Sequence, residues 1–132
     1  MIVPAIHLPG NCKEAIEFYQ QVFDVTDVCI DYFRNAPPDP SFPVSEDIHD
    51  HVMHSEITIC GSRLNMSDTQ EKLAAGNMIC LNVFFKSGDE VCQVFQRLKE
   101  GGKVVVELGP QFFSPMYGSI EDKFGLKWQL IS

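Results

Sequence analysis

The sequence has no apolar run approaching the roughly 18–20 residues of a membrane span, and its start lacks the pattern of a signal peptide. It is also short of positive charge, because 10 Lys and Arg residues stand against 18 Asp and Glu residues, for a net charge of −8. Nucleic acid requires a clustered basic surface, so this balance disfavours it as a partner. We therefore expect a cytoplasmic protein that binds neither membranes nor nucleic acid.

Paired cysteines are missing as well. The five cysteines are an odd number and none belongs to a C-x-x-C pair: Cys12, Cys29, Cys60, Cys80 and Cys92. This pattern fits neither a disulfide framework nor a zinc knuckle, so we expect buried, reduced thiols. The sequence also lacks a phosphate loop, a dinucleotide fingerprint and a nucleophile–base arrangement, which disfavours kinases, dehydrogenases and serine hydrolases.

What the sequence does contain is a repeat. Capping boxes begin at Asn11 and Ser87, each with a Glu three residues on, and they predict one helix over residues 12–23 and another that stops at Gly101. Alternating apolar segments predict eight strands, at residues 3–8, 28–33, 54–60, 63–67, 78–85, 103–108, 117–120 and 126–131. Each half therefore has the order strand, helix, strand, strand, strand over about 65 residues.

The two halves align through their glycine turns, Gly61 and Gly125. A glycine takes positive φ without a Cβ penalty, so a hairpin turn at each position has a physical cause. The alignment pairs Arg63 with Lys127, Leu64 with Trp128, Asn65 with Gln129, and Met66 with Leu130.

The repeat predicts an α+β fold in a single domain, residues 1–132, with module one at about 1–68 and module two at about 76–132. We expect two βαβββ modules that form a curved mixed sheet around a cleft, with the helices outside. Residues 34–50 carry four of the eight prolines and are expected to form a surface loop, either functional or disordered. A second loop is expected from Gly109 to the strand at 117.

The chain resembles the vicinal-oxygen-chelate superfamily of glyoxalase, bleomycin-resistance and extradiol-dioxygenase proteins, and within it the PhnB-type branch. The matching segments lie at residues 10–19, 54–61, 67–68, 98–102 and 117–128, and they are spread over essentially the whole chain. The resemblance implies two βαβββ modules, a homodimer and a ligand cleft. PhnB-type proteins are often labelled as 3-demethylubiquinone methyltransferase-like, but nothing in this sequence resembles a site for S-adenosylmethionine.

The resemblance also implies four positions for metal-binding His and Glu side chains. The last-strand positions fall on Asn65 and Gln129, and the first-strand positions on Pro4 and near residues 80–82. Amides bind transition metals weakly and proline offers no side-chain ligand, so a divalent metal is disfavoured and no metal ligand is assigned. His7 lies three residues from the implied position, with the wrong strand parity, and is either a structural histidine or a cleft residue.

The other histidines leave two alternatives open. His49, His51 and His54 chelate a metal with Asp50, or they belong to a solvated loop end. His54 shares one strand face with Glu56, which makes them either a proton-transfer pair or part of a solvent or dimer face. No catalytic residue is identified from the sequence.

Strand alternation suggests a binding surface instead. If the apolar residues of strands 63–67 and 126–131 face the helices, the polar residues between them face the cleft. Two amides beside two cations suit a small anionic or carbonyl-bearing ligand, unless the cations lie in water at the sheet rim. The expected ligand-binding residues are Arg63, Asn65, Lys127 and Gln129, with Phe113 and Tyr117 as apolar walls.

The leading hypothesis is a PhnB-type homodimer that binds a small molecule in its cleft without the family's catalytic metal. The alternative is a metal-dependent lyase, isomerase or dioxygenase whose rearranged ligands recruit His7 or Glu56. A dimeric scaffold without a ligand is the third possibility.

Overall fold

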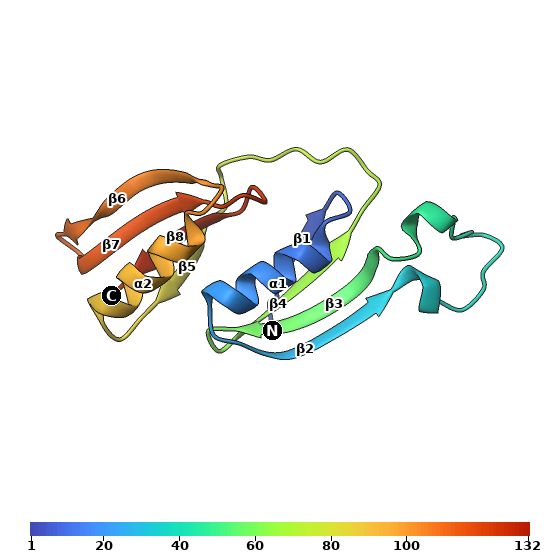
Figure 1. The fold of residues 1–132 in the computed structure, drawn as a ribbon, viewed down its shortest axis with the longest axis horizontal. Helices are drawn as coiled ribbons and strands as arrows, with labels where there is room; N and C mark the ends of the chain where they lie inside the picture. The colour runs from blue at the N-terminus through green and yellow to red at the C-terminus, as the bar shows by residue number, and fades with distance from the viewer. The chain divides into compact units, whose positions relative to one another are not determined.

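The computed structural model describes residues 1–132, and in it four strands and one α-helix follow one another in the same order twice (Figure 1). The chain divides into two compact units, Met1–Leu73 and Ala74–Ser132. The first contains β1 (Ala5–Leu8), α1 (Cys12–Val22), β2 (Val25–Tyr32), β3 (Val52–Ile59) and β4 (Ser62–Asp68). The second contains β5 (Leu81–Phe84), α2 (Gly88–Leu98), β6 (Lys103–Gln111), β7 (Ser114–Glu121) and β8 (Lys127–Ile131).

Each unit forms its own four-stranded mixed sheet. The strand orders are β1-β4-β3-β2 and β5-β8-β7-β6, in which the β1–β4 and β5–β8 pairs are parallel and all other pairs are antiparallel. The α+β class and the repeated βαβββ order are confirmed. The eight strands are divided between two sheets. We call the unit that contains β1–β4 and α1 module one, and the unit that contains β5–β8 and α2 module two.

One face of each sheet is apolar, and strand alternation determines which residues it contains. Leu64 and Met66 on β4 and Trp128 and Leu130 on β8 are all buried, while the residues between them are not. Figure 1 shows α1 lying over one face of its own sheet, and the same holds for α2 in module two. The polar residues of β4 and β8 therefore lie on the opposite face, which we call the open face.

Helix α2 approaches its sheet closely because Gly118 on β7 has no side chain. A Cβ at this position would lie 2.7 Å from Cδ2 of Phe95, a buried residue of α2. The equivalent position in module one is Ser55, because Ser55 pairs with Met66 as Gly118 pairs with Leu130. Ser55 is fully buried and its hydroxyl donates to the Met66 carbonyl at 2.6 Å.

The β7–β8 turn forms as expected around Gly125, whose φ is +90°. Asp122 stabilises this turn with its side chain. Its Oδ1 accepts from the backbone N–H of Phe124 at 2.9 Å and of Leu126 at 3.1 Å, and its Oδ2 accepts from Trp128 Nε1 at 2.8 Å. The turn and the core are thus joined through one buried carboxylate.

The two helix starts differ from one another. Ser87 caps α2 as expected, since its Oγ accepts from Glu90 N at 3.3 Å. The capping box at Asn11 is wrong: its side chain makes no capping bond, and Oδ1 is buried without a partner. Asp68 at the end of β4 takes this place, because its Oδ1 accepts from Cys12 N at 3.0 Å. A carboxylate that is distant in sequence therefore replaces the local cap.

Asp68 makes two further backbone bonds. It accepts from Gly10 N at 2.9 Å and, through Oδ2, from Val52 N at 2.8 Å. The carboxylate itself is buried. It therefore connects the β1–α1 turn, the start of α1 and the start of β3.

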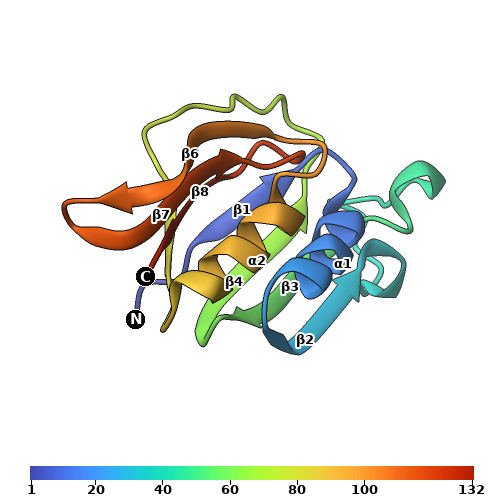
Figure 2. The ribbon, with the colours of Figure 1, turned by 60° about the vertical axis from the view of Figure 1, so that its left-hand side comes forward.

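The expected loop from Gly109 is wrong, because β6 and β7 continue into it. Strand β6 extends to Gln111 and β7 begins at Ser114, so only a short turn separates them, at the end of the hairpin in Figure 2. Strand β6 lies at the edge of its sheet, where Pro110 does not have to donate a ladder hydrogen bond. Neither α1 nor α2 has the length and apolar character required to cross a membrane.

Candidate functional site

The open face of module one carries a row of hydrogen-bonded polar side chains. Arg63 and Asn65 are neighbours on β4, and Arg63 Nε donates to Asn65 Oδ1 at 3.2 Å. Across the sheet, Glu56 on β3 lies opposite Asn65, and its Oε1 accepts from Arg63 Nη2. The same Oε1 lies 3.3 Å from His54 Nε2. The row therefore runs His54, Glu56, Arg63, Asn65.

His7 lies on this open face as well. It pairs with Ser67 across the parallel β1–β4 ladder, and its Nδ1 lies 3.1 Å from Ser67 Oγ. The β1 residue opposite Asn65 is Ala5, because Pro4 precedes the strand and accepts only through its carbonyl from Asn65 N at 3.0 Å. Pro4, the first-strand position that the resemblance implies, therefore lies just outside β1.

The open face of module two contains Lys127 and Gln129 on β8. Lys127 Nζ lies 3.5 Å from Glu121 Oε1, and these residues are directly opposite across the β7–β8 ladder. Gln129 lies between Ser119 on β7 and Asn82 on β5. The side chain of Lys127 is only 17% exposed, so this cation is more shielded from water than Arg63, at 43%.

Aromatic residues continue the open face of module two toward the β6–β7 turn. The rings of Phe113 and Tyr117 meet edge to face with centroids 5.2 Å apart, and Phe112 meets Phe113 in the same way at 5.3 Å. Tyr117 is buried, whereas Phe112 and Phe113 are exposed. The structure thus places both expected apolar residues in one aromatic row.

The carboxylate partners of the two cations are what sequence reasoning missed. Each expected cation faces a glutamate on the neighbouring strand, Glu56 for Arg63 and Glu121 for Lys127. Counting outward from the glycine turns places Glu56 beside Asn65, so register would have revealed the first pair. Because both cations are paired, neither open face presents an uncompensated positive charge at these positions.

The donor set at the family's metal positions does not fit a metal site. The implied positions carry Pro4, Asn65, Gln129 and one of residues 80–82, so two are amides and one offers no side-chain ligand. No three His, Cys, Asp or Glu side chains are grouped so that they could hold a metal ion. Asp50 in the histidine-rich segment is bound by Arg34 at 2.6 Å.

The cysteines differ in exposure, which corrects the expectation of uniformly buried thiols. Cys12 is buried, Cys60 and Cys92 are half-buried, and Cys29 and Cys80 are exposed. Burial, together with the nearby Asp68 carboxylate, raises the pKa of the Cys12 thiol from 9.0 to about 12. Cys29 lies on β2 and pairs with Glu56 on β3. Because β2 is the edge strand of its sheet, no strand lies on its other side.

Comparison with known protein families gives a match over nearly the whole chain. The model of the 3-demethylubiquinone-9 3-methyltransferase family matches residues 1–131. The curated protein YjdN from Escherichia coli K12 is 24% identical over 139 residues, which cover 96% of this chain and 91% of YjdN.

Solved structures with the same fold include protein PA1353 from Pseudomonas aeruginosa, with a TM-score of 0.83 and 27% identity over 99% of this chain and 96% of that one. The PhnB protein from Bacillus cereus, described as a putative 3-demethylubiquinone-9 3-methyltransferase, has a TM-score of 0.76 and 25% identity over 98% and 97%. A mutant of the fosfomycin resistance protein FosX from Listeria monocytogenes, complexed with Mn(II) and a dihydroxypropylphosphonic acid, has a TM-score of 0.65 and 12% identity over 99% and 90%.

Proposed function

Because this chain belongs to the 3-demethylubiquinone-9 3-methyltransferase family, in the PhnB-type branch of the vicinal-oxygen-chelate superfamily, we propose that it binds a small polar molecule on its open faces without a catalytic metal. The proposed ligand carries a carbonyl or a weakly anionic group. The family description is not evidence of methyl transfer here, since no segment of the chain resembles a site for a methyl donor.

The observation that carries this proposal is the pair of equivalent amides, Asn65 and Gln129. Each lies on the open face, and each is neighboured on its own strand by a cation that a glutamate neutralises. A side-chain amide offers both a donor and an acceptor, which suits a carbonyl or hydroxyl group. A paired cation favours a neutral or singly charged ligand, because a strongly charged one would compete with the glutamate.

The aromatic row of module two supports the same class of ligand. Small-molecule sites are mainly apolar with a few polar groups that set orientation. Tyr117 and Phe113 provide such apolar surface beside β8, and Tyr117 lies opposite Ile131 on that strand. We therefore expect a ligand with an apolar portion as well as a carbonyl group.

A thermal-shift screen of small carbonyl compounds and carboxylates would test the proposal. A compound that stabilises the protein is then titrated into the double variant Arg63→Gln/Lys127→Gln and into a control, Lys72→Gln/Lys86→Gln, whose positions are exposed and lie outside β4 and β8. We expect binding to weaken about tenfold in the first and to remain unchanged in the control. Equal affinity in both variants would refute the proposed site.

A metal-dependent reaction is the second candidate, favoured by the presence of His7 and Glu56 on the same open face as Asn65. The manganese in the FosX complex belongs to a protein that is similar to this chain in fold alone. Metal analysis of protein purified without chelators separates the two. About one Zn, Ni, Fe or Mn ion per chain, lost in His7→Ala, would favour the enzyme.

A homodimer is part of the proposal and requires its own test. Sedimentation or light scattering at several concentrations gives the mass of the particle directly. A protein that forms a dimer but shows neither metal nor ligand would favour the scaffold hypothesis instead.

A further inference from the structure

The connection between β2 and β3 forms a closed loop that extends beyond the ends of these strands in Figure 1. At its base Phe33 N donates to the His51 carbonyl at 3.1 Å. Within it, Phe42 N donates to the Asp39 carbonyl at 3.0 Å, which turns the chain back. The prolines between residues 37 and 43 fix their own φ and reduce the number of alternative conformations. The loop is thus held in shape by backbone bonds and by its sequence.

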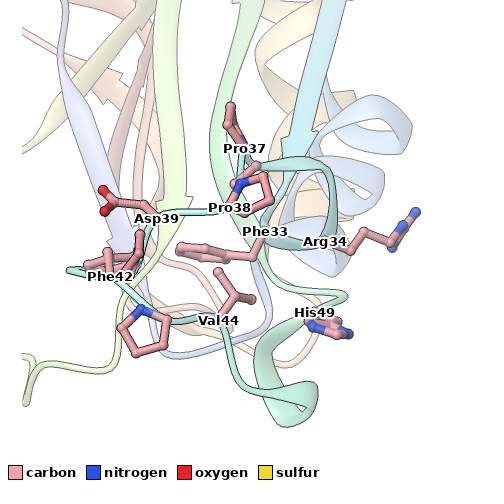
Figure 3. A pocket seen from close by; sticks show the side chains of 11 residues that line it. Phe33, Arg34, Pro37, Pro38, Asp39, Phe42, Val44 and His49 are labelled. Carbon is pink, nitrogen blue, oxygen red and sulfur yellow. The ribbon is translucent and has the colours of Figure 1, made fainter.

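Two hollows share an aromatic pair in this loop. The rings of Phe33 and Phe42 stack with centroids 6.4 Å apart and an angle of 19° between their planes, and both residues line both hollows. Figure 3 shows the first hollow, of about 420 Å³, in which Pro38 and Val44 lie on opposite sides of the Phe33 ring. This hollow is lined mainly by rings and prolines.

The second hollow, of about 370 Å³, has a different chemical character. Its apolar wall consists of Phe33, Phe42 and Ile48. Its other wall is the end of β4 and the residues after it, which include the acidic residues Asp68 and Glu71. The volume is in the range of small-ligand sites, roughly 300–1,000 Å³.

The charges in this second hollow are of one sign. No Lys or Arg side chain is among its lining residues, and His51 is the remaining ionisable group. The Asp68 carboxylate is already bound by three backbone N–H groups, whereas Glu71 is exposed to solvent. Its backbone N donates to Thr69 Oγ1 at 3.1 Å, which orders the segment that carries it. A bound cation would therefore find Glu71 beside two aromatic rings.

We propose that this second hollow is a binding site for small organic cations. The apolar body of the ligand packs against Phe33 and Phe42, and its ammonium group lies beside the Glu71 carboxylate. Aromatic faces attract an ammonium group through their quadrupole, and a carboxylate compensates its charge. The site shares no residue with the proposed carbonyl-binding residues of the open faces, so the two are independent.

Titration with benzyltrimethylammonium tests the proposal, with benzyl alcohol and benzylsulfonate as neutral and anionic probes. We expect saturable binding of the cation alone, with backbone amide NMR shifts at Thr69–Glu71. Glu71→Gln and Phe42→Leu should each weaken that binding about tenfold, which corresponds to about 1.4 kcal/mol. Both positions are exposed, so neither change should disturb the fold. Glu17→Gln, on the exposed side of α1, changes the net charge equally and should bind as the unmodified protein does.

The proposal would be overturned by no saturable binding of the cation, by equal affinity for all three probes, or by an affinity that Glu71→Gln leaves unchanged. The Arg63→Gln/Lys127→Gln variant should bind the cation normally. Loss of cation binding in that variant would indicate that the cation binds on the open faces, and it would refute the second hollow as the binding site. Failure of the carbonyl ligand alone would leave the cation titration unaffected, so the two proposals fail separately.

Discussion

The two modules share one topology but carry different side chains on their open faces. In module one Glu56 lies opposite the amide of Asn65 and bonds to Arg63. In module two the glutamate lies two pairs further along the ladder, since Ser119 lies opposite Gln129 and Glu121 lies directly opposite Lys127. The equivalent cations, Arg63 and Lys127, are therefore both paired with a glutamate, but the two glutamates occupy different positions in their sheets.

The first strands differ more strongly. His7 pairs with Ser67 on the open face of module one, and the equivalent residue of module two is Phe84, which pairs with Ile131. Module one therefore collects titratable groups and module two collects aromatic surface. The duplicated backbone fixes where an open-face residue lies, and the side chains have diverged in what they offer a ligand.

The largest expected effect comes from the two buried carboxylates. Asp68→Ala removes the acceptor of three backbone N–H groups in module one and should lower the free energy of unfolding by about 3 kcal/mol. Asp122→Ala removes a similar set in the β7–β8 turn. Hydrogen exchange should show lost protection in residues 5–68 for the first variant and in residues 81–131 for the second. Loss across the whole chain in both would show that the modules unfold as one unit.

The close approach of α2 to its sheet gives the next largest effect. Gly118→Ala places a Cβ 2.7 Å from the Phe95 ring and should cost about 2 kcal/mol, measured by urea denaturation. Gly109→Ala in the neighbouring strand is the control, because no atom lies within 4 Å of a Cβ there. Module one has a side chain, Ser55, at the position equivalent to Gly118. If Gly118→Ala were as stable as Gly109→Ala, α2 would lie no closer to its sheet than α1 does to its own.

Alkaline pH should separate the modules through Cys12, whose counterpart at the start of α2 is Gly88. Because the folded pKa of Cys12 is raised to about 12, the folded state binds more protons than the unfolded state above pH 9. The stability contribution is therefore complete below pH 9 and is lost as the pH rises toward 12. Between pH 9 and 12, the urea midpoint should fall less in Cys12→Ala than in the exposed control Cys29→Ala. An equal fall in both variants would show that the Cys12 thiol does not cause the loss of stability.

The smallest effects are expected from the open-face ion pairs. Glu56→Gln should change the free energy of unfolding by less than about 1 kcal/mol, because both partners are substantially exposed and screened by water. Glu121→Gln should cost slightly more, since Lys127 is more buried. Both differences should shrink in high NaCl. A larger loss of unfolding free energy for Glu56→Gln than for Glu121→Gln would contradict this prediction.

The fold and the open faces could be predicted because they depend on local periodicity. Alternation along β4 and β8 identifies Leu64 and Trp128 as core residues, and the polar residues between them follow. The turn at Gly125 could be predicted because positive φ strongly favours glycine.

The missed features depend on strand pairing or on contacts between distant segments. The local pattern at Asn11 satisfies a capping box, yet the backbone N–H of Cys12 bonds to Asp68 because β4 ends beside the helix start. The Glu56–Arg63 pair requires the register of β3 against β4. The exposure of Cys29 follows from the edge position of β2, which no segment-by-segment pattern contains.

The parallel pairing of β1 with β4 and of β5 with β8 has a consequence for synthesis on the ribosome. Strand β1 leaves the exit tunnel long before β4, its hydrogen-bonding neighbour, has been translated. Strand β8 is inserted between β5 and β7, and Ser132 completes this arrangement by donating to the Met116 carbonyl at 3.1 Å. Neither sheet can close while its fourth strand is still being made, so nascent module one should become protease-resistant only after Asp68 has emerged, and module two only after Ile131.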